Sequence, residues 1–256
     1  MAVELKNAGE IDRMRAAGRI VAEILDALEA KVAPGVSTWD LDQLAERLIH
    51  EKGAQPAFKG YRGFPAVLCT SLNHEVVHGI PSKKRLLVEG DLLKLDFGVV
   101  VDGFFGDAAR TVPVGRISKA ARSLSDATRA SLEAGIRAMV PGNRVGDIGH
   151  AVQSTVEPLG FSVVRDFVGH GIGRRLHEAP QVPNYGRPGT LELLRPGMVL
   201  AVEPMVNAGT AAVDVLDDDW TAVTVDGKLS SHWEHTILVT DQGPEVLTRR
   251  VDGATG

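Results

Sequence analysis

The sequence predicts an α+β protein in which two similar halves pack about a pseudo-twofold axis and share a central antiparallel sheet covered by helices. Three features carry this prediction: Pro-Gly pairs at the same relative position in both halves, helical apolar stripes in the same register, and a strand acid in one half that matches a strand acid in the other. All three repeat at an offset of 107 residues. We therefore expect one catalytic domain over 1–256, with halves at about 8–115 and 116–250.

A long helix is expected at the start of each half. The helical patterns cover about 8–32 and 118–139, and each ends at a Pro-Gly pair, at 34–35 or 141–142. A proline followed by glycine stops a helix, so both helices should end before these turns.

A second, shorter helix follows each Pro-Gly pair. Ser37 and Asp40 have the spacing of a capping box, which marks the start of the first of these helices. Each helix carries an apolar stripe at i, i+3, i+4, i+7 and i+8. The stripes are Leu41, Leu44, Ala45, Leu48 and Ile49 and, 107 positions later, Ile148, Ala151, Val152, Thr155 and Val156.

One short strand in each half ends in an acid. The segments "DLLKLD" and "MVLAVE" end at Asp96 and Glu203, and each begins just after a glycine turn, at Gly90 or Gly197. Because both acids occupy the same place in their repeats, we expect them to meet where the halves meet.

The pair Asp102-Gly103 predicts a two-residue hairpin turn of type I′, because both positions of that turn need a positive φ. Gly98 then faces Asp107, and Asp96 becomes the diagonal neighbour of Asp107 at about 7 Å between Cβ atoms. Two unpaired carboxylates so close on a covered face are unfavourable, so a metal ion is the natural neutraliser. Gly98 would leave room for an ion or a substrate.

The letters Asp96-Phe97-Gly98 match a protein kinase triplet, but the kinase interpretation fails on context. No glycine-rich loop, V-A-I-K strand or H-R-D loop precedes them. The segment "GHGIG" also lacks the last glycine of G-x-G-x-x-G and any Walker lysine.

The composition limits the partners that the protein can have and the cell compartment in which we expect it. A net charge of −5 argues against nucleic-acid reading, and no apolar run is long enough to span a bilayer. The single cysteine excludes an intrachain disulfide, and the first residues are charged where a signal peptide would be apolar. We expect a cytoplasmic protein.

Two histidines and a further acid extend the predicted site. His170 lies between glycines in "GHGIGRRLHEAP", His177 follows seven residues later, and Glu234 lies in "SSHWEHTILVT". The assembled ligand set is Asp96, Asp107, His170, Glu203 and Glu234. Four carboxylates and an imidazole suit two divalent ions such as Mn, Fe, Co or Zn. Two such ions can activate a water molecule and polarise a carbonyl, which is hydrolytic chemistry.

The sequence resembles the type I methionine aminopeptidases of the pita-bread metallopeptidase family M24 over nearly its whole length. The resemblance is carried by "MRAAGRIVAEIL", "LCTSLNHEVVHGIP", "DGFFGD", "GFSVVRDFVGHGIGRRLHEAPQVPNYG", "LRPGMVLAVEPMVNAG" and "LSSHWEHTILVT". It implies a pita-bread fold and metal-dependent removal of the N-terminal methionine from nascent chains with a small second residue. It also implies a monomer, possible work at the ribosome, and loss of Met1 from this chain, because Ala2 is small.

The resemblance implies a role for each predicted site residue. Asp107 and Glu234 would bridge the two ions, Asp96 would complete one, and His170 with Glu203 the other. Glu203 would also be the general base, His177 would donate to the developing oxyanion, and His78 would bind the peptide amide beyond the scissile bond. The side-chain pocket would consist of Phe58, Tyr61, Phe64, Cys69, His78 and Trp220.

Three residues depart from the family's usual pattern. Phe58 stands where bacterial members often have cysteine, Leu176 where an aromatic residue is common, and Lys94 where asparagine is frequent. These changes bear on the pocket shape and on the charge beside Asp96.

Two alternatives remain. The letters "DFG" and "ARTVPVG" look closer to the prolidase and aminopeptidase P branch of the same fold, which cleaves X-Pro bonds. Against that branch, His170 and His177 are only seven residues apart, and the approach to Glu234 lacks its arginine. A non-catalytic binding protein is the other alternative, although such proteins typically lose metal ligands.

Overall fold

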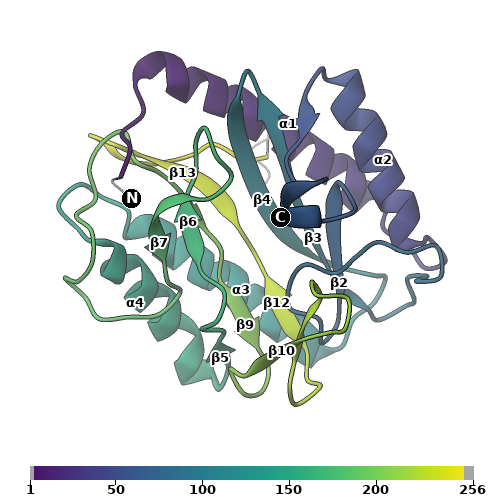
Figure 1. The fold of residues 1–256 in the computed structure, drawn as a ribbon. Coiled ribbons are helices and arrows are strands. Elements are labelled where there is room, and N and C mark those ends of the chain that lie inside the picture. The colour runs from purple at the N-terminus through teal and green to yellow at the C-terminus, as the bar shows by residue number, and fades with distance from the viewer. Residues whose placement is uncertain (1–2, 251–256) are drawn as a thin grey trace.

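The structure, a computed structural model, describes residues 3–250 and is an α+β fold with helices packed on antiparallel sheets (Figure 1). Met1 and Ala2, on which the expected methionine removal depends, lie outside the described residues. In chain order the elements are α1 (Ala8–Lys31), α2 (Thr38–Glu51), β1 (Gln55–Pro56), η1 (Tyr61–Gly63), β2 (Leu68–Leu72), β3 (Leu92–Val101), β4 (Phe104–Pro113), α3 (Lys119–Arg137), α4 (Val145–Val156), η2 (Glu157–Leu159), β5 (Ser162–Val163), β6 (Gly169–Gly171), β7 (Glu178–Val182), β8 (Val199–Val202), β9 (Met205–Asn207), β10 (Val213–Val215), β11 (Ala222–Thr224), β12 (Ser230–His232), β13 (His235–Thr240) and β14 (Gly243–Val246).

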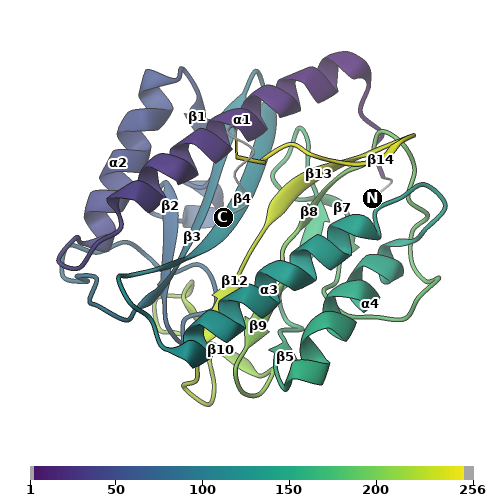
Figure 2. The same ribbon diagram turned by 180° about the vertical axis from the view of Figure 1, so that it is seen from behind.

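The helices form where the apolar stripes predict them. Asn7 and Ser37 are the N-caps of α1 and α2, and each makes a reciprocal capping box with the residue three positions on. Both long helices end two or three residues before their Pro-Gly turns, at Lys31 and Arg137. α1 packs on β3 and β4, while α3 packs on β8, β9 and β12 (Figure 2).

The first half is built around the predicted hairpin. β3 and β4 pair antiparallel through the turn at Asp102-Gly103, where both residues have positive φ, 47° and 77°. Gly98 pairs with Asp107 and Asp96 with Ala109, which confirms the expected register. β2 pairs on the other edge of β3, with Cys69 opposite Asp96.

The second half contains a five-stranded sheet in the order β14-β13-β8-β6-β7 and a three-stranded sheet in the order β12-β9-β5. β8 is shorter than the predicted strand: it ends at Val202, so Glu203 lies just beyond it. Glu234 also lies outside a strand, in the short link between β12 and β13. Both acids therefore stand where strands end and side chains can turn toward the first half.

The two halves are joined along β4. The amide of Glu234 donates to the Ala109 carbonyl at 2.9 Å, and the Ala109 amide returns a bond to Glu234 at 3.4 Å. Next to this pair, the Asp107 amide donates to the Thr236 hydroxyl, which in turn donates to the Asp107 carbonyl at 2.7 Å. These four bonds form a seam that fixes Asp107 and Glu234 side by side.

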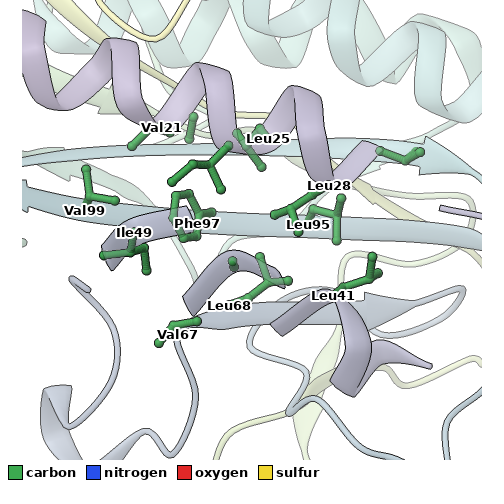
Figure 3. Close-up of a cluster of buried hydrophobic side chains, with 14 of the residues drawn as sticks. Val21, Leu25, Leu28, Leu41, Ile49, Val67, Leu68, Leu95, Phe97 and Val99 are labelled. Carbon is green, nitrogen blue, oxygen red and sulfur yellow. The ribbon is translucent and has the colours of Figure 1, made fainter. Parts of the chain in front are cut away.

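The core of the first half lies between its helices and its sheet (Figure 3). Leu25 and Leu28 of α1 and Leu41 of α2 are fully buried against strand residues such as Leu95 and Phe97. Burying such side chains stabilises the fold by roughly 1.5–3 kcal/mol each. This packing makes the strand that carries Asp96 a rigid support.

Corresponding positions in the two halves have similar backbone conformations. Gly90 and Gly197, which precede β3 and β8, have φ values of 97° and 89°, a region that favours glycine. We propose on this basis that the single domain divides near 115 into two repeats. No helix among residues 3–250 has the length and apolar character needed to cross a membrane.

Two glycines of α1 give a stability test. A Cβ on Gly18 would lie 2.4 Å from the Leu247 carbonyl oxygen, whereas a Cβ on Gly9 would meet nothing closer than 3.6 Å. Gly18→Ala should therefore lower the free energy of unfolding by about 1–3 kcal/mol, despite the better helix propensity of alanine. Gly9→Ala should raise it by roughly 0.4–1 kcal/mol. Urea unfolding measures both; equal effects would contradict the close packing of α1 on the C-terminal segment.

Candidate metal centre and substrate pocket

One cavity of about 620 Å³ brings together residues from both halves of the fold. All predicted site residues line it. They are Phe58, Tyr61, Phe64, Cys69, His78, Asp96, Asp107, His170, His177, Glu203, Trp220 and Glu234.

Three of the predicted ligands form the tightest group. Asp107 on β4, His170 on β6 and Glu234 beside β13 each offer a ligand atom, and these atoms lie within 4.8 Å of one another. All three residues are buried. The seam explains the first and third members, because the reciprocal bonds of Ala109 and Glu234 set β4 against the start of β13.

Asp96 and Glu203 flank this group but lie outside its tightest part. Asp96 is the diagonal neighbour of Asp107 across the β3–β4 ladder. Glu203 lies beside His170, with 3.4 Å between Glu203 Oε1 and His170 Nε2. Pairing of His170 with Ala201 explains this, because Glu203 follows Ala201 by two residues on the same face.

His170 has the protonation state of a metal ligand. Its Nδ1 lies 3.0 Å from the Gly171 carbonyl oxygen, to which an N–H at Nδ1 donates. The lone pair is then at Nε2, which faces Glu203. Burial lowers the pKa of His170 to about 3, so the imidazole is neutral.

The carboxyl groups are buried at high electrostatic cost. Burial raises the pKa of Asp96 to about 7. Burial, and then the charges of the neighbouring carboxylates, raise the pKa values of Asp107, Glu203 and Glu234 well above the ordinary range. Without a cation these groups hold protons near neutral pH.

The chemistry of this cluster fits divalent metal ions. One oxygen each of Asp96, Asp107 and Glu234 is buried and has no hydrogen-bond partner among the described residues. Arg62 is the one permanently cationic residue among the described residues that line the cavity, and it is exposed. Oxygen ligands with one imidazole suit borderline-hard divalent cations, which would satisfy the free oxygens and offset the burial cost.

His177 lies at the cavity mouth and contacts two other site residues. Its Nδ1 lies 2.8 Å from the Tyr61 hydroxyl, and its ring centroid lies 4.2 Å from that of His170. Desolvation in the cavity and the Arg62 charge lower the pKa of His177, which favours the neutral ring. If the tyrosine hydroxyl donates to Nδ1, the ring proton is on Nε2 and can be donated to a substrate.

His78 is held in a strained backbone conformation. Its φ is 62°, which costs a non-glycine residue energy and is typical of functional positions. Its ring packs edge-on against Phe167 and Trp220. Burial lowers its pKa to about 4, so it is neutral near pH 7.

The apolar end of the cavity is aromatic. Phe58 and Phe64 are buried, and Phe64 meets Trp220 edge-on with ring centroids 5.0 Å apart. Cys69 is a buried free thiol whose pKa is raised by burial and by the nearby carboxylates, so it stays protonated and serves as wall.

The three departures from the family pattern have different consequences. Phe58 fits because Gly98 leaves space: a Cβ there would lie 3.0 Å from the Phe58 ring. Leu176 is buried in the pocket wall. Lys94 is fully buried outside the cavity lining and donates to the Asn73 carbonyl at 2.9 Å, and burial lowers its pKa to about 7.

Several residues in or next to the cavity are not predicted from the sequence. His232 is buried, its Nε2 lies 3.9 Å from Glu203 Oε2, and neither ring nitrogen has a hydrogen-bond partner in the described structure. Strand alternation back from Glu234 was the signal that could have identified it. Phe167, Gln181 and Met205 line the cavity itself, and no local pattern marks them.

The fold and this buried cluster of acids and imidazole define a metal-dependent hydrolase. The family model described as Metallopeptidase family M24 matches residues 12–241. The chain therefore belongs to metallopeptidase family M24, as its resemblance predicted.

Similar proteins within this family are methionine aminopeptidases. The Methionine aminopeptidase of Clostridium acetobutylicum is 54% identical over 244 residues, covering 95% of this chain and 98% of that protein. Methionine aminopeptidase 1 of Bacillus subtilis is 51% identical with the same coverage. The crystal structure of methionine aminopeptidase from Thermotoga maritima superposes with a TM-score of 0.96, at 47% identity, over 97% of this chain and 100% of that one. The predicted pita-bread fold is confirmed.

The prolidase branch shares the fold at lower similarity. Prolidase from Pyrococcus furiosus superposes with a TM-score of 0.77 at 22% identity, and the match covers 96% of this chain but 65% of that chain. The glycine in "DFG" is therefore a local likeness between branches that have the same fold.

The raised pKa of Asp96 leads to a pH-dependent stability. Its folded pKa of about 7 is above the unfolded value, so the metal-free folded state binds an extra proton between about pH 4 and 7. The contribution of protonated Asp96 to the free energy of unfolding is thus present at low pH and is lost as the pH rises through 7. We expect the Tm of the chelated wild-type protein to fall between about pH 5 and 8. This fall should exceed the fall in the Asp96→Asn variant by about 3 °C or more. Thermal denaturation measures this, and identical losses would contradict the burial cost.

Proposed function

We propose that this chain removes the initiator methionine from the N-termini of proteins, as a methionine aminopeptidase. The observation that carries the proposal is the arrangement of the cavity: buried acids and His170 adjoin an aromatic pocket. An α-amino group and a methionine side chain can occupy such a site together. We further propose that a small second residue is required.

Two divalent cations held by Asp96, Asp107, His170, Glu203 and Glu234 complete the proposed site. When bound, they would lower the pKa of a water molecule toward neutrality and polarise the scissile carbonyl. The partnerless oxygens of Asp96, Asp107 and Glu234 support this ligand set. Co, Mn, Fe and Zn are all compatible with it.

Glu203 is the proposed general base. Its carboxylate lies between His170 and His232, at 3.4 and 3.9 Å, and it reaches the cavity from the end of β8. A carboxylate at this place can accept the proton of the attacking water and pass it to the leaving amine. Burial and the neighbouring carboxylates raise the pKa of Glu203 in the metal-free site, and bound cations would favour the ionised form that can accept a proton.

His177 and His78 are proposed to act on the substrate backbone. The Tyr61 hydroxyl holds Nδ1 of His177, which leaves an Nε2–H to donate to the oxyanion that develops on the scissile carbonyl. His78 is neutral and fixed by Phe167 and Trp220, so it can bond the peptide amide beyond the scissile bond.

The pocket walls suit a methionine side chain. Phe58, Tyr61, Phe64, Cys69 and Trp220 offer aromatic faces and a thiol, against which a thioether packs favourably. None of these five side chains carries a charge that could pair with a charged substrate side chain.

The proposed substrates also define the partners and the location. We propose that the protein acts in the cytoplasm on nascent polypeptides, at or near the ribosome, without reading nucleic acid. A monomer is proposed as the working form, because a single chain supplies all the proposed site residues.

Hydrolysis of a Met-Ala peptide beside an X-Pro peptide tests the proposal. The protein with Mn²⁺ or Co²⁺ should cleave Met-Ala and leave X-Pro intact, because the site fits methionine and its similar relatives are methionine aminopeptidases. Chelator should abolish the cleavage. Liberated methionine is the quantity to measure. Cleavage of X-Pro alone would instead support the prolidase branch, and activity in chelator would refute the metal mechanism.

A further inference from the structure

The N-terminal segment before α1 lies against the loop that carries His177. Lys6 is buried and pairs with Glu178, with 2.6 Å between Nζ and Oε2 and 3% of each side chain exposed. The Lys6 amide also donates to the Gly197 carbonyl at 2.8 Å, which fixes the segment to the turn before β8.

Glu178 is the residue directly after His177 and the first residue of β7. Its second carboxylate oxygen accepts the Arg175 amide at 3.1 Å, and the residue pairs with Gly171 next to His170. The carboxylate therefore closes the turn from Gly171 to Glu178. His170 lies at one end of this turn and His177 at the other.

The space around the ion pair is filled. A Cβ on Gly173 would lie 2.3 Å from Lys6 Cε and 2.9 Å from Glu178 Oε1. The Gly173 carbonyl in turn accepts the Phe105 amide at 2.9 Å. The lysine stem thus fits closely into the turn, and its Nζ, 2.6 Å from Glu178, also lies 3.8 Å from Glu4 Oε2.

Two exposed ion pairs run parallel to the buried one. Glu10 meets Arg174 at 3.0 Å and Glu4 meets Arg175 at 3.4 Å. Exposed pairs contribute little to stability because water screens them. The buried pair is also weak evidence for stability, because desolvation offsets its attraction. The main consequence of the buried pair is geometric: by holding Glu178, it fixes the backbone position of His177.

We propose that the segment Glu4–Glu10 is an N-terminal clamp on this turn, and that Lys6 and Glu178 are positioning residues for His177. The clamp acts through backbone geometry: it holds Glu178, which places the His177 ring within reach of both Tyr61 and the cavity. This inference rests on the proposed function, in which His177 donates to the oxyanion.

A double-mutant cycle between Lys6 and His177 tests the clamp. The metal-loaded enzyme is assayed on a Met-Ala peptide as wild type, Lys6→Met, His177→Ala and the double variant. Lys6→Met should lower kcat about ten- to a hundredfold, the scale expected for a misplaced catalytic group, with KM nearly unchanged. In the His177→Ala background the same change should cost less than about twofold, since nothing remains to be positioned.

A matched control and a second variant keep the outcome decisive. Lys52→Met removes a surface pair with Glu23 and should leave kcat unchanged. If Lys6→Met fails to fold, Glu178→Gln weakens the same contact while keeping an oxygen for the Arg175 amide, and it takes the place of Lys6→Met in the cycle. An equal loss of kcat in both backgrounds, or no loss in either, would overturn the clamp. A wild-type enzyme that leaves Met-Ala intact would instead refute the proposed function on which it rests.

Discussion

The burial of four carboxyl groups in one cavity is the constraint on which the rest of the structure depends. The four groups come from separate positions in the chain and have little contact with solvent. They belong to Asp96, Asp107, Glu203 and Glu234. Burial raises the pKa values of all four, and neighbouring carboxylates raise those of Asp107, Glu203 and Glu234 further, so the metal-free arrangement opposes its own ionisation. A bound cation would instead favour the ionised carboxylates, because they would then be its ligands.

The seam between the halves makes this crowding structurally feasible. Reciprocal bonds between Ala109 and Glu234, with Thr236 bonded twice to Asp107, hold the strands without help from the carboxylates. Side-chain oxygens therefore remain free for ions. A rigid backbone that supplies its own hydrogen bonds is what lets a site keep unpaired acids at its centre.

Sequence periodicity and turn chemistry predicted the parts of the site that local rules determine. The Asp102-Gly103 turn fixed the register that places Asp96 diagonal to Asp107, and the 107-residue repeat related Asp96 to Glu203. Asp107, His170 and Glu234 meet only through the tertiary seam and the β6–β8 pairing, which no local pattern encodes. The sequence identified these three as candidate ligands and the family resemblance implied their roles, but neither placed their ligand atoms within reach of one another. His232 and the Lys6–Glu178 pair were missed because their partners are distant in sequence.

Proton release on metal binding tests the central claim most directly. Calorimetric titration of the chelated protein with Mn²⁺ near pH 7, in two buffers of different ionisation enthalpy, gives the number of protons displaced. Carboxyl groups held protonated by burial should release about one proton or more per chain as the metal binds. Binding with no proton release would show that the acids are already ionised in the metal-free protein, and would contradict the account.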